Sequence, residues 1–242
     1  MRPPEFDQFS SSYDDLLKDP LRDRFTGNES LFFHQRKSQL IRKFFRRRKA
    51  DMSGLSYLDV GCGKGELVTL LRGDFGRTAG CDVSAGMMVA IEGIETRVQT
   101  DPLGIPFGDS EFDFVTAVCV YHHVPVEARL SLTAEIFRVL RPGGVFCMIE
   151  HNPLNPVTRA IVRRAPVDAN AILLRAREGR SLASQTAFAR ETTEYFLYFP
   201  KNLYRILGGL EPWLAKIPLG GQYAIFSEKS GAGRPSTASL PR

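Results

Sequence analysis

The chain has 242 residues, of which 43% are hydrophobic and 24% are charged, and its net charge is +5. This length and composition suit one globular α/β domain with elaborations, long enough to bury a core. They exclude a membrane-spanning protein, because no window holds the roughly 18 consecutive apolar residues that a span requires. The four cysteines stand singly, without a C-x-x-C pair, and the N-terminus has no apolar secretory core. We therefore expect buried core cysteines and a cytoplasmic protein.

The first 54 residues are predicted to be helical. Phe6, Phe9 and Tyr13 recur at spacings of three and four residues, and a second helix is expected over about 30–48. Much of the positive charge lies between residues 36 and 49. We favour a solvated helix face there, because the apolar residues between the basic ones recur at helical spacing; a patch for anionic lipid or nucleic acid is the alternative. These apolar residues are Leu40, Ile41, Phe44 and Phe45.

Residues 55–66 are the most informative segment, a short apolar strand that runs into three glycines at alternate positions. The glycines leave no Cβ where the backbone must turn sharply and contact a ligand. Their spacing, G-x-G-x-G, differs from the dinucleotide fingerprint, because Glu66 stands where its third glycine should be. A P-loop is excluded as well, and Asp59 just before the turn suits an amine-bearing ligand better than a pyrophosphate. The glycines are Gly61, Gly63 and Gly65.

Asp82 is predicted to bind a ribose in the same ligand. It ends a second strand, over 77–82, and follows Gly61 at the distance typical of an acidic residue that accepts hydrogen bonds from ribose hydroxyls. A ligand that has a ribose, tolerates a nearby negative charge and lacks a diphosphate matches S-adenosyl-L-methionine, whose demethylated product is S-adenosyl-L-homocysteine.

Four segments, in order, resemble class I S-adenosylmethionine-dependent methyltransferases, specifically the type-11 group with small-molecule acceptors. They are 58–65, 81–84 with Met87, 101–107 followed by 112–114, and 140–144, so the resemblance covers roughly 55–150. It implies an α/β fold: a Rossmann-like, seven-stranded, mostly parallel sheet with helices on both faces. It also implies an N-terminal helical lid and a helical insert after strand five.

The resemblance also assigns residues to the cofactor. Asp59 and the glycine turn would surround its methionine part, Asp82 its ribose, and Val83 with Met87 its adenine. Tyr13, and residues 32–34 with Lys37, look like lid residues. The full set of expected cofactor residues is Tyr13, Asp59, Gly61, Cys62, Gly63, Gly65, Asp82, Val83, Met87, Asp101, Pro102 and Val120, with either Asp101 or Pro102 at the adenine edge.

The alternation of strands and helices predicts a parallel sheet. Strands are expected at 56–60, 77–82, 96–100, 112–120 and 144–150, with two closing strands at 192–199 and 222–227, and helices at 65–72, 84–91 and 126–139. We expect three parts: a lid (1–54), a core (55–228) with a mostly helical insert at about 151–187, and a disordered tail (229–242) rich in Ser, Gly and Pro.

The catalytic groups are expected where strands four and five end, because sites in such sheets lie outside the carboxyl ends of the strands. His122 is the first choice for a general base, since histidine titrates near neutrality. His123 is either catalytic or structural, and Glu150 or His151 either binds the acceptor or fixes the proline-broken loop that follows. No metal-ligand spacing is present, so no metal is expected.

The acceptor is expected to be a small molecule methylated on oxygen or nitrogen, such as a quinone, a natural product or a lipid-linked intermediate. Enzymes that methylate amino groups of DNA or protein carry an Asn/Asp-Pro-Pro-Tyr type motif where this chain has Val-Tyr-His-His, and Cys119 is expected inside a strand rather than as a nucleophile. The apolar stretch 195–225 is expected to cover an edge strand, with an acceptor wall or a lipid contact as alternatives. An RNA-modifying enzyme and a cofactor-binding protein without turnover remain alternative functions.

Overall fold

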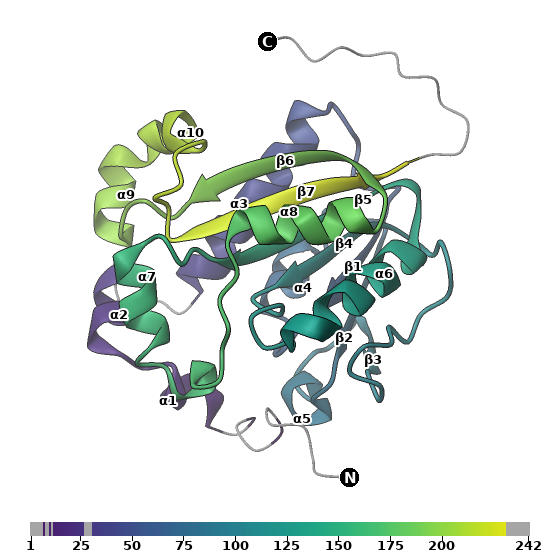
Figure 1. Cartoon of the computed structure of the whole chain (residues 1–242), viewed down its shortest axis with the longest axis horizontal. Helices are drawn as coiled ribbons and strands as arrows, with labels where there is room; N and C mark the ends of the chain where they lie inside the picture. Colours follow the sequence, from purple (N-terminus) through teal and green to yellow (C-terminus); the bar gives the residue numbers. More distant parts are fainter. Residues whose placement is uncertain (1–6, 8–9, 11, 27–30, 231–242) are drawn as a thin grey trace.

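Seven strands form one sheet in the order β3-β2-β1-β4-β5-β7-β6, which confirms the predicted fold (Figure 1). The computed structural model describes all residues except 1–6, 8–9, 11, 27–30 and 231–242. The first five strands are parallel, and β7 is antiparallel to both of its neighbours. The strands are β1 (Ser56–Val60), β2 (Arg77–Asp82), β3 (Glu95–Val98), β4 (Phe112–Val118), β5 (Leu140–His151), β6 (Phe188–Phe196) and β7 (Gln222–Lys229).

Helices cover both faces of the sheet and divide the core into two apolar layers. Tyr57 and Leu58 are neighbours on β1, so their side chains point to opposite faces. Tyr57 packs in the layer under α3 and α4, and Leu58 in the layer under α6 and α8. The helices that flank the sheet are α3 (Phe32–Arg47), α4 (Glu66–Leu71), α5 (Ala85–Met88), α6 (Arg129–Val139) and α8 (Ala176–Gln185).

Helix α3 is amphipathic as predicted. Its four apolar residues named above are buried, and Phe44 stacks on Phe226 of β7 with 4.0 Å between ring centroids. The helix begins at Phe32; the expected start near residue 30, like Phe6 and Phe9, lies outside the described residues. None of the helices in the described part of the chain has the length and apolar character needed to cross a bilayer.

Two pairs of short helical segments, one near residue 20 and one near residue 160, line one cavity beside the carboxyl ends of β1 and β4. They are α1 (Tyr13–Leu16), α2 (Pro20–Thr26), α7 (Pro156–Val162) and the 3-10 turn η3 (Pro166–Asp168). Figure 1 shows α1, α2 and α7 at the same end of the sheet. Helix α7 begins at Pro156 because the Asn155 side chain accepts a hydrogen bond from the Thr158 amide and proline suits the first helical turn. The insert is therefore mostly helical, as expected.

Several strand bounds differ from the prediction. β4 ends at Val118 rather than 120, because Cys119 adopts a left-handed backbone (φ 57°) that turns the chain out of the strand. β5 begins at Leu140 rather than at 144, because Leu140 pairs with Phe112 before a register shift, so segment 140–144 of the family resemblance lies within the strand. β3 and β6 are also displaced toward the N-terminus.

The C-terminal region closes the sheet and adds a second group of short helices. These are α9 (Lys201–Leu207), the turn η4 (Gly208–Leu210) and α10 (Glu211–Leu214), while the turn η2 (Val126–Ala128) precedes α6. Lys229 ends β7, one residue beyond the expected core, and residues 231–242 of the expected tail lie outside the described part. The domain boundaries stay a prediction.

Candidate functional site

The glycine turn after β1 has the backbone that only glycine adopts easily. Gly61, Gly63 and Gly65 have φ values of 69°, 54° and 76°. At Gly61 a Cβ would lie 2.5 Å from Cγ2 of Val120, so the turn packs directly on the end of β4. At Gly63 a Cβ would meet only Cε of Met87, at 3.7 Å, and this side of the turn faces the cavity.

Asp82 ties the turn to the end of β2. Its Oδ2 accepts a hydrogen bond from the Gly63 amide at 2.8 Å, and its Oδ1 accepts one from the Ser84 amide at 2.9 Å. Ser84 in turn caps α5 by accepting from the Met87 amide. Burial raises the pKa of the Asp82 carboxyl, although the amide hydrogen bonds oppose the shift. The carboxylate therefore lies at the cavity wall, fixed from behind, with lone pairs left for a ligand.

Asp59 is a second carboxyl at the same wall and lies almost out of contact with solvent. Its Oδ1 accepts a hydrogen bond from Oγ1 of Thr116 at 2.5 Å. Burial raises the pKa of Asp59 to about 7, while Thr116 and Lys37 oppose the shift. A cationic ligand group beside this carboxyl would stabilise its charged form.

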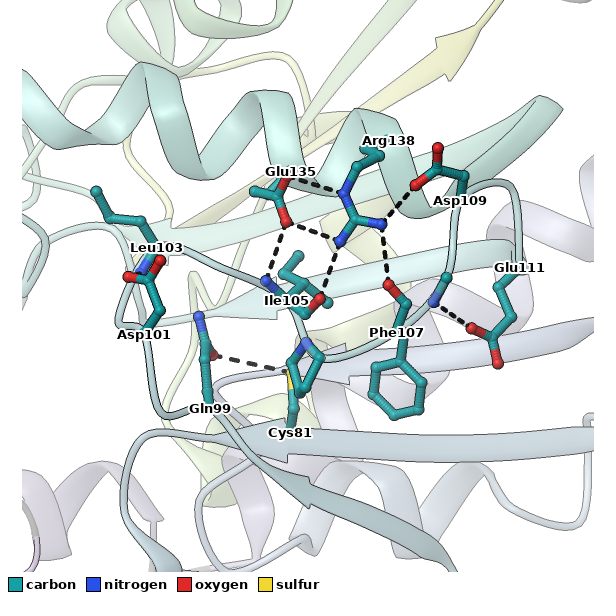
Figure 2. Close-up of polar contacts among 12 residues, drawn as sticks. Cys81, Gln99, Asp101, Leu103, Ile105, Phe107, Asp109, Glu111, Glu135 and Arg138 are labelled. Carbon is teal, nitrogen blue, oxygen red and sulfur yellow. Dashed lines mark hydrogen bonds and ion pairs between the residues drawn. The ribbon is translucent and has the colours of Figure 1, made fainter.

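The loop from Gln99 to Glu111 carries Pro102 to the cavity and is held by one arginine (Figure 2). Arg138 of α6 donates to the carbonyls of Ile105 and Phe107, at 2.9 Å each, and pairs with Asp109 at 2.7 Å. Its helix neighbour Glu135 accepts from both Arg138 and the Ile105 amide. The loop position is therefore set by α6.

The His122 ring lies between two carboxylates of the site. Its Nδ1 lies 2.5 Å from Oε2 of Glu150, and its Nε2 lies 3.5 Å from Oδ1 of Asp168 on η3. Burial disfavours a charge on His122, but the two carboxylates outweigh it and hold its pKa well above the usual range. Glu150 also accepts from the Tyr121 amide at 2.7 Å. These contacts favour the imidazolium form of His122, and its role as a general base stays a prediction.

His123 follows the same loop to a more exposed place. Its Nε2 lies 3.4 Å from Oδ1 of Asp168, so that this aspartate faces both histidines. In the described part of the chain, His122, His123 and Asp168 are the group whose ligand atoms lie close enough to hold a metal ion, within 4.8 Å of one another. Charge pairing between the His122 imidazolium and the Asp168 carboxylate accounts for the short distances in this group. The expectation that no metal binds here stays a prediction.

Cys119 lies at the cavity and not in the core, which corrects the sequence prediction. Nε2 of Gln222 donates to its Sγ at 3.5 Å, and Nζ of Lys37 lies 4.0 Å away. Burial alone would raise the pKa of this thiol, but Lys37 and His151 lower it to about 7. The other three cysteines are buried as expected. Cys119 differs from the other cysteines because the chain turns out of β4 at this residue, which directs the thiol into the cavity at the strand end.

A cavity of about 420 Å³ joins these groups, in the size range of small-molecule sites. Of the predicted site residues, those that line it are Tyr13, Asp59, Gly61, Cys62, Gly63, Asp82, Val83, Met87, Pro102, Val120, His122 and His123. Three do not line it. Gly65 turns the chain into α4, Asp101 is exposed and accepts from the Leu103 amide, and Glu150 is buried behind His122. Pro102 rather than Asp101 is therefore the residue at the cavity.

Other residues that line the cavity were missed from the sequence. Arg22 comes from α2, Gln222 from β7 and Asp168 from η3. No fixed spacing connects them to the glycine turn, because the tertiary fold brings them there. Lys37 was expected as a lid residue and does line the cavity, where it is only 4% exposed.

Several basic side chains of the run on and after α3 form ion pairs with other parts of the chain, although residues 46–49 are exposed. Arg42 pairs with Asp74, Arg48 pairs with Glu228, and Glu194 accepts from two further basic side chains. Arg36 pairs with Glu211 on α10. These ion pairs account for much of the run, which therefore gives no support to the RNA alternative.

Comparisons with known proteins agree with this geometry. Residues 58–148 match the model of the methyltransferase-domain family. A demethylmenaquinone methyltransferase from Lactococcus lactis is 32% identical over 165 residues, which cover 63% of this chain and 59% of that protein. The chain thus spans about three fifths of the length of this relative.

The fold is shared with solved methyltransferases at low identity. A SAM-dependent methyltransferase from Thermotoga maritima has a TM-score of 0.66 at 15% identity, over 93% of this chain and 98% of that one. Phosphoethanolamine N-methyltransferase 2 of Haemonchus contortus, in complex with S-adenosylhomocysteine, has a TM-score of 0.59 at 19% identity, over 93% and 58%. The predicted class I fold is confirmed, and residues 58–148 match the family that the resemblance predicted, whose cofactor is S-adenosyl-L-methionine.

Proposed function

We propose, from the membership of residues 58–148 in the methyltransferase-domain family, that this chain transfers a methyl group from S-adenosyl-L-methionine to a small, mainly apolar acceptor. The observation that carries the proposal is the contact between Asp82 and the Gly63 amide at the cavity wall. It places a carboxylate and a stretch of backbone without side chains on the same ligand surface. This arrangement suits the sugar and amino-acid parts of one ligand.

The residues present fit this cofactor. Asp82 would accept hydrogen bonds from the ribose hydroxyls, and Val83, Met87 and Pro102 offer apolar surface for the adenine. Asp59 would pair with the amino group, because a cation restores the charge that burial suppresses. When bound, the cofactor supplies a methyl group that is already activated by a positively charged sulfur, so the protein mainly aligns the reactants and excludes water.

The acceptor is held by the histidine cluster. Both ring nitrogens of His122 face carboxylates, Nδ1 that of Glu150 and Nε2 that of Asp168. The positive charge of its imidazolium, rather than a free N–H, would therefore stabilise negative charge on an acceptor oxygen. An O–H or N–H acceptor also releases a proton. His123, whose Nε2 faces Asp168 at the cavity wall, is the group placed to take it.

The acceptor class follows from the remaining cavity wall, which is largely apolar. Phe25 and Phe33 contribute from the lid, Val157 and Ile161 from α7, and Leu197 from the chain after β6. The relative from Lactococcus lactis is named for a quinone acceptor. We therefore infer a quinone-like or lipid-linked acceptor. This apolar wall favours turnover, because a protein that binds only the cofactor would need no surface for a second molecule.

Titration calorimetry with S-adenosylhomocysteine tests the cofactor site. Asp82→Asn should weaken binding at least about tenfold, the size expected for charge-assisted hydrogen bonds. The matched control is Asp101→Asn, an exposed aspartate outside the cavity, which should bind like the wild type. Equal affinities for the three proteins would overturn the assignment. The acceptor class is tested by measuring the transfer of a radiolabelled methyl group to a reduced naphthoquinone. RNA is offered in parallel as the alternative acceptor, and His122→Gln tests the role of the histidine cluster.

A further inference from the structure

The segment of α9, η4 and α10 exposes an unusual number of apolar side chains. Trp213 is 84% exposed and Ile206 is 79% exposed. Leu203, Ile206, Leu210 and Trp213 follow one another at spacings of three and four residues, which places them on one side of the helical segment. Ile217 and Leu219, in the loop that follows, are exposed as well. We call these six residues the α9–α10 face.

The opposite side of the segment is fixed to the protein. The ring of Tyr204 lies under the Arg36 guanidinium, with 3.8 Å from its central carbon to the ring centroid, and Glu211 pairs with the same arginine. Glu211 is also buried and accepts from the Tyr198 amide at 3.0 Å. These contacts hold the segment against α3, so its apolar side is presented outward at one end of the molecule, as Figure 1 shows for α9 and α10.

Within residues 201–221, the exposed charges are all positive. Glu211 is the only acidic residue there, and it is buried against Arg36. Arg205 and Lys216 are exposed among the apolar residues, and the partly exposed Glu191 of β6 lies beside Lys216. Exposed apolar side chains with cations among them are typical of proteins that rest on an anionic lipid surface.

We propose that the α9–α10 face docks on an anionic membrane surface, with Trp213 and Ile206 inserted among the lipid headgroups. The sequence offered anionic lipid as an alternative for the basic run on α3 and lipid contact as an alternative for residues 195–225. The structure favours the second surface, because many side chains of the basic run are ion-paired. Helix α9 packs against α2, and α2 lines the cavity through Arg22 and Phe25. Docking would therefore place the membrane beside the lid of the cavity.

Trp213 is the only tryptophan in the chain, so its own fluorescence reports docking. Vesicles of phosphatidylcholine with phosphatidylglycerol should shift its emission to shorter wavelength and carry the protein into the pellet. Vesicles of phosphatidylcholine alone should do so at least about tenfold more weakly, and added salt should weaken the binding to anionic vesicles. Ile206→Ser should lower the partition coefficient about tenfold, while the Trp213 signal is still available.

The matched control is Val89→Ser, which replaces an equally exposed apolar residue (82%) beside α5, away from α9 in Figure 1. It should bind vesicles like the wild type. Arg205→Glu with Lys216→Glu should lose binding to anionic vesicles while keeping the same melting temperature. Three results would each overturn the proposal: no binding to anionic vesicles, equal binding to neutral ones, or an emission shift that follows protein concentration without vesicles, which would show that a second copy covers this face.

Discussion

Nδ1 of His122 lies 2.5 Å from Oε2 of Glu150, and the two side chains are 1% and 0% exposed. A charged pair this deeply buried is stable only because each partner compensates the other, and because Asp168 and the Tyr121 amide satisfy the remaining polar atoms. Because Glu150 does not line the cavity, we infer that its carboxylate positions the imidazolium rather than binding the acceptor.

Replacement of Glu150 by glutamine should destabilise the protein by about 3 kcal/mol, the cost of leaving one buried charge without its partner. The pH dependence follows from two opposite shifts. Glu150 has a lowered pKa, so its contribution is present above about pH 4.5 and is lost as the pH falls. His122 has a raised pKa, so its contribution is complete below about pH 6.5 and is lost as the pH rises through that raised value.

The difference in melting temperature between wild type and Glu150→Gln should thus be largest between about pH 4.5 and pH 6.5. Without the Glu150 charge, the effect of burial on the pKa of His122 dominates and lowers it. The His122 ring resonance should therefore titrate at lower pH in an NMR experiment. Glu127→Gln, at an exposed glutamate, is the control and should change neither quantity. A His122 titration that stays the same in Glu150→Gln would contradict the imidazolium assignment.

The raised pKa of Asp59 predicts that the affinity for the cofactor depends on pH. Burial raises its pKa to about 7 in the free protein, so below this pH the carboxyl is protonated and must lose a proton before it can pair with an ammonium group. Affinity for S-adenosylhomocysteine should therefore fall about tenfold from pH 8 to pH 6, as the linkage of one proton requires. Calorimetry at the two pH values measures the change.

Asp59→Asn serves as the control in the same experiment, because asparagine cannot titrate. The affinity of Asp59→Asn should be lower than that of the wild type at pH 8 and nearly the same at both pH values, which isolates the contribution of Asp59. If the variant keeps the full pH dependence of the wild type, another group is responsible.

The contrast between the glycine turn and the histidine cluster shows what the sequence could predict. The turn is local, since Gly61 to Gly65 and Asp82 lie in one strand–turn–helix–strand unit. The length of this unit brings the Asp82 carboxylate to the Gly63 amide. The strand expected at 112–120 could be predicted for the same reason, because its apolar, β-prone residues are consecutive in the sequence. Asp168 is different: it reaches His122 only because the insert folds back over the sheet. No periodicity or spacing in the sequence indicates that contact.

Cys119 shows a second limit. Its β-prone neighbours predicted a strand through residue 120, and only the left-handed backbone at this residue turns the thiol into the cavity. Bulky residues rarely adopt that backbone, so propensity argued against it. The partners that set its chemistry, Lys37 and Gln222, come from opposite ends of the chain.

Gly61 should not tolerate a side chain, for two separable reasons. Alanine there would require a left-handed backbone and would place Cβ 2.5 Å from Val120. Gly143 has a similar backbone (φ 81°), but nothing lies within 4 Å of its Cβ position. Gly143→Ala should cost about 1 kcal/mol from backbone strain, and Gly61→Ala about 3 kcal/mol, since the clash adds to it.

Urea unfolding measures both values, and calorimetry with S-adenosylhomocysteine shows the effect on the site. Gly143→Ala should bind the ligand normally, whereas Gly61→Ala should lose binding because the turn must move away from β4. Equal unfolding free energies for the two variants would show that Val120 does not restrict the turn.

Cys119 should be the cysteine that reacts first with iodoacetamide. Its pKa of about 7 makes about half of it thiolate at neutral pH, whereas burial raises the pKa of the thiols of Cys62, Cys81 and Cys147. The rate of alkylation, followed by mass spectrometry, should rise about tenfold from pH 6 to pH 8 and level off above it, as one group titrating near pH 7 requires.

Lys37→Met should shift this transition to higher pH, because the positive charge beside the thiol is removed. S-adenosylhomocysteine should slow the reaction, since thiol and ligand share one cavity, and Cys119→Ser should abolish it. Alkylation that begins at Cys62 or Cys147 would show that the cavity does not present the Cys119 thiol.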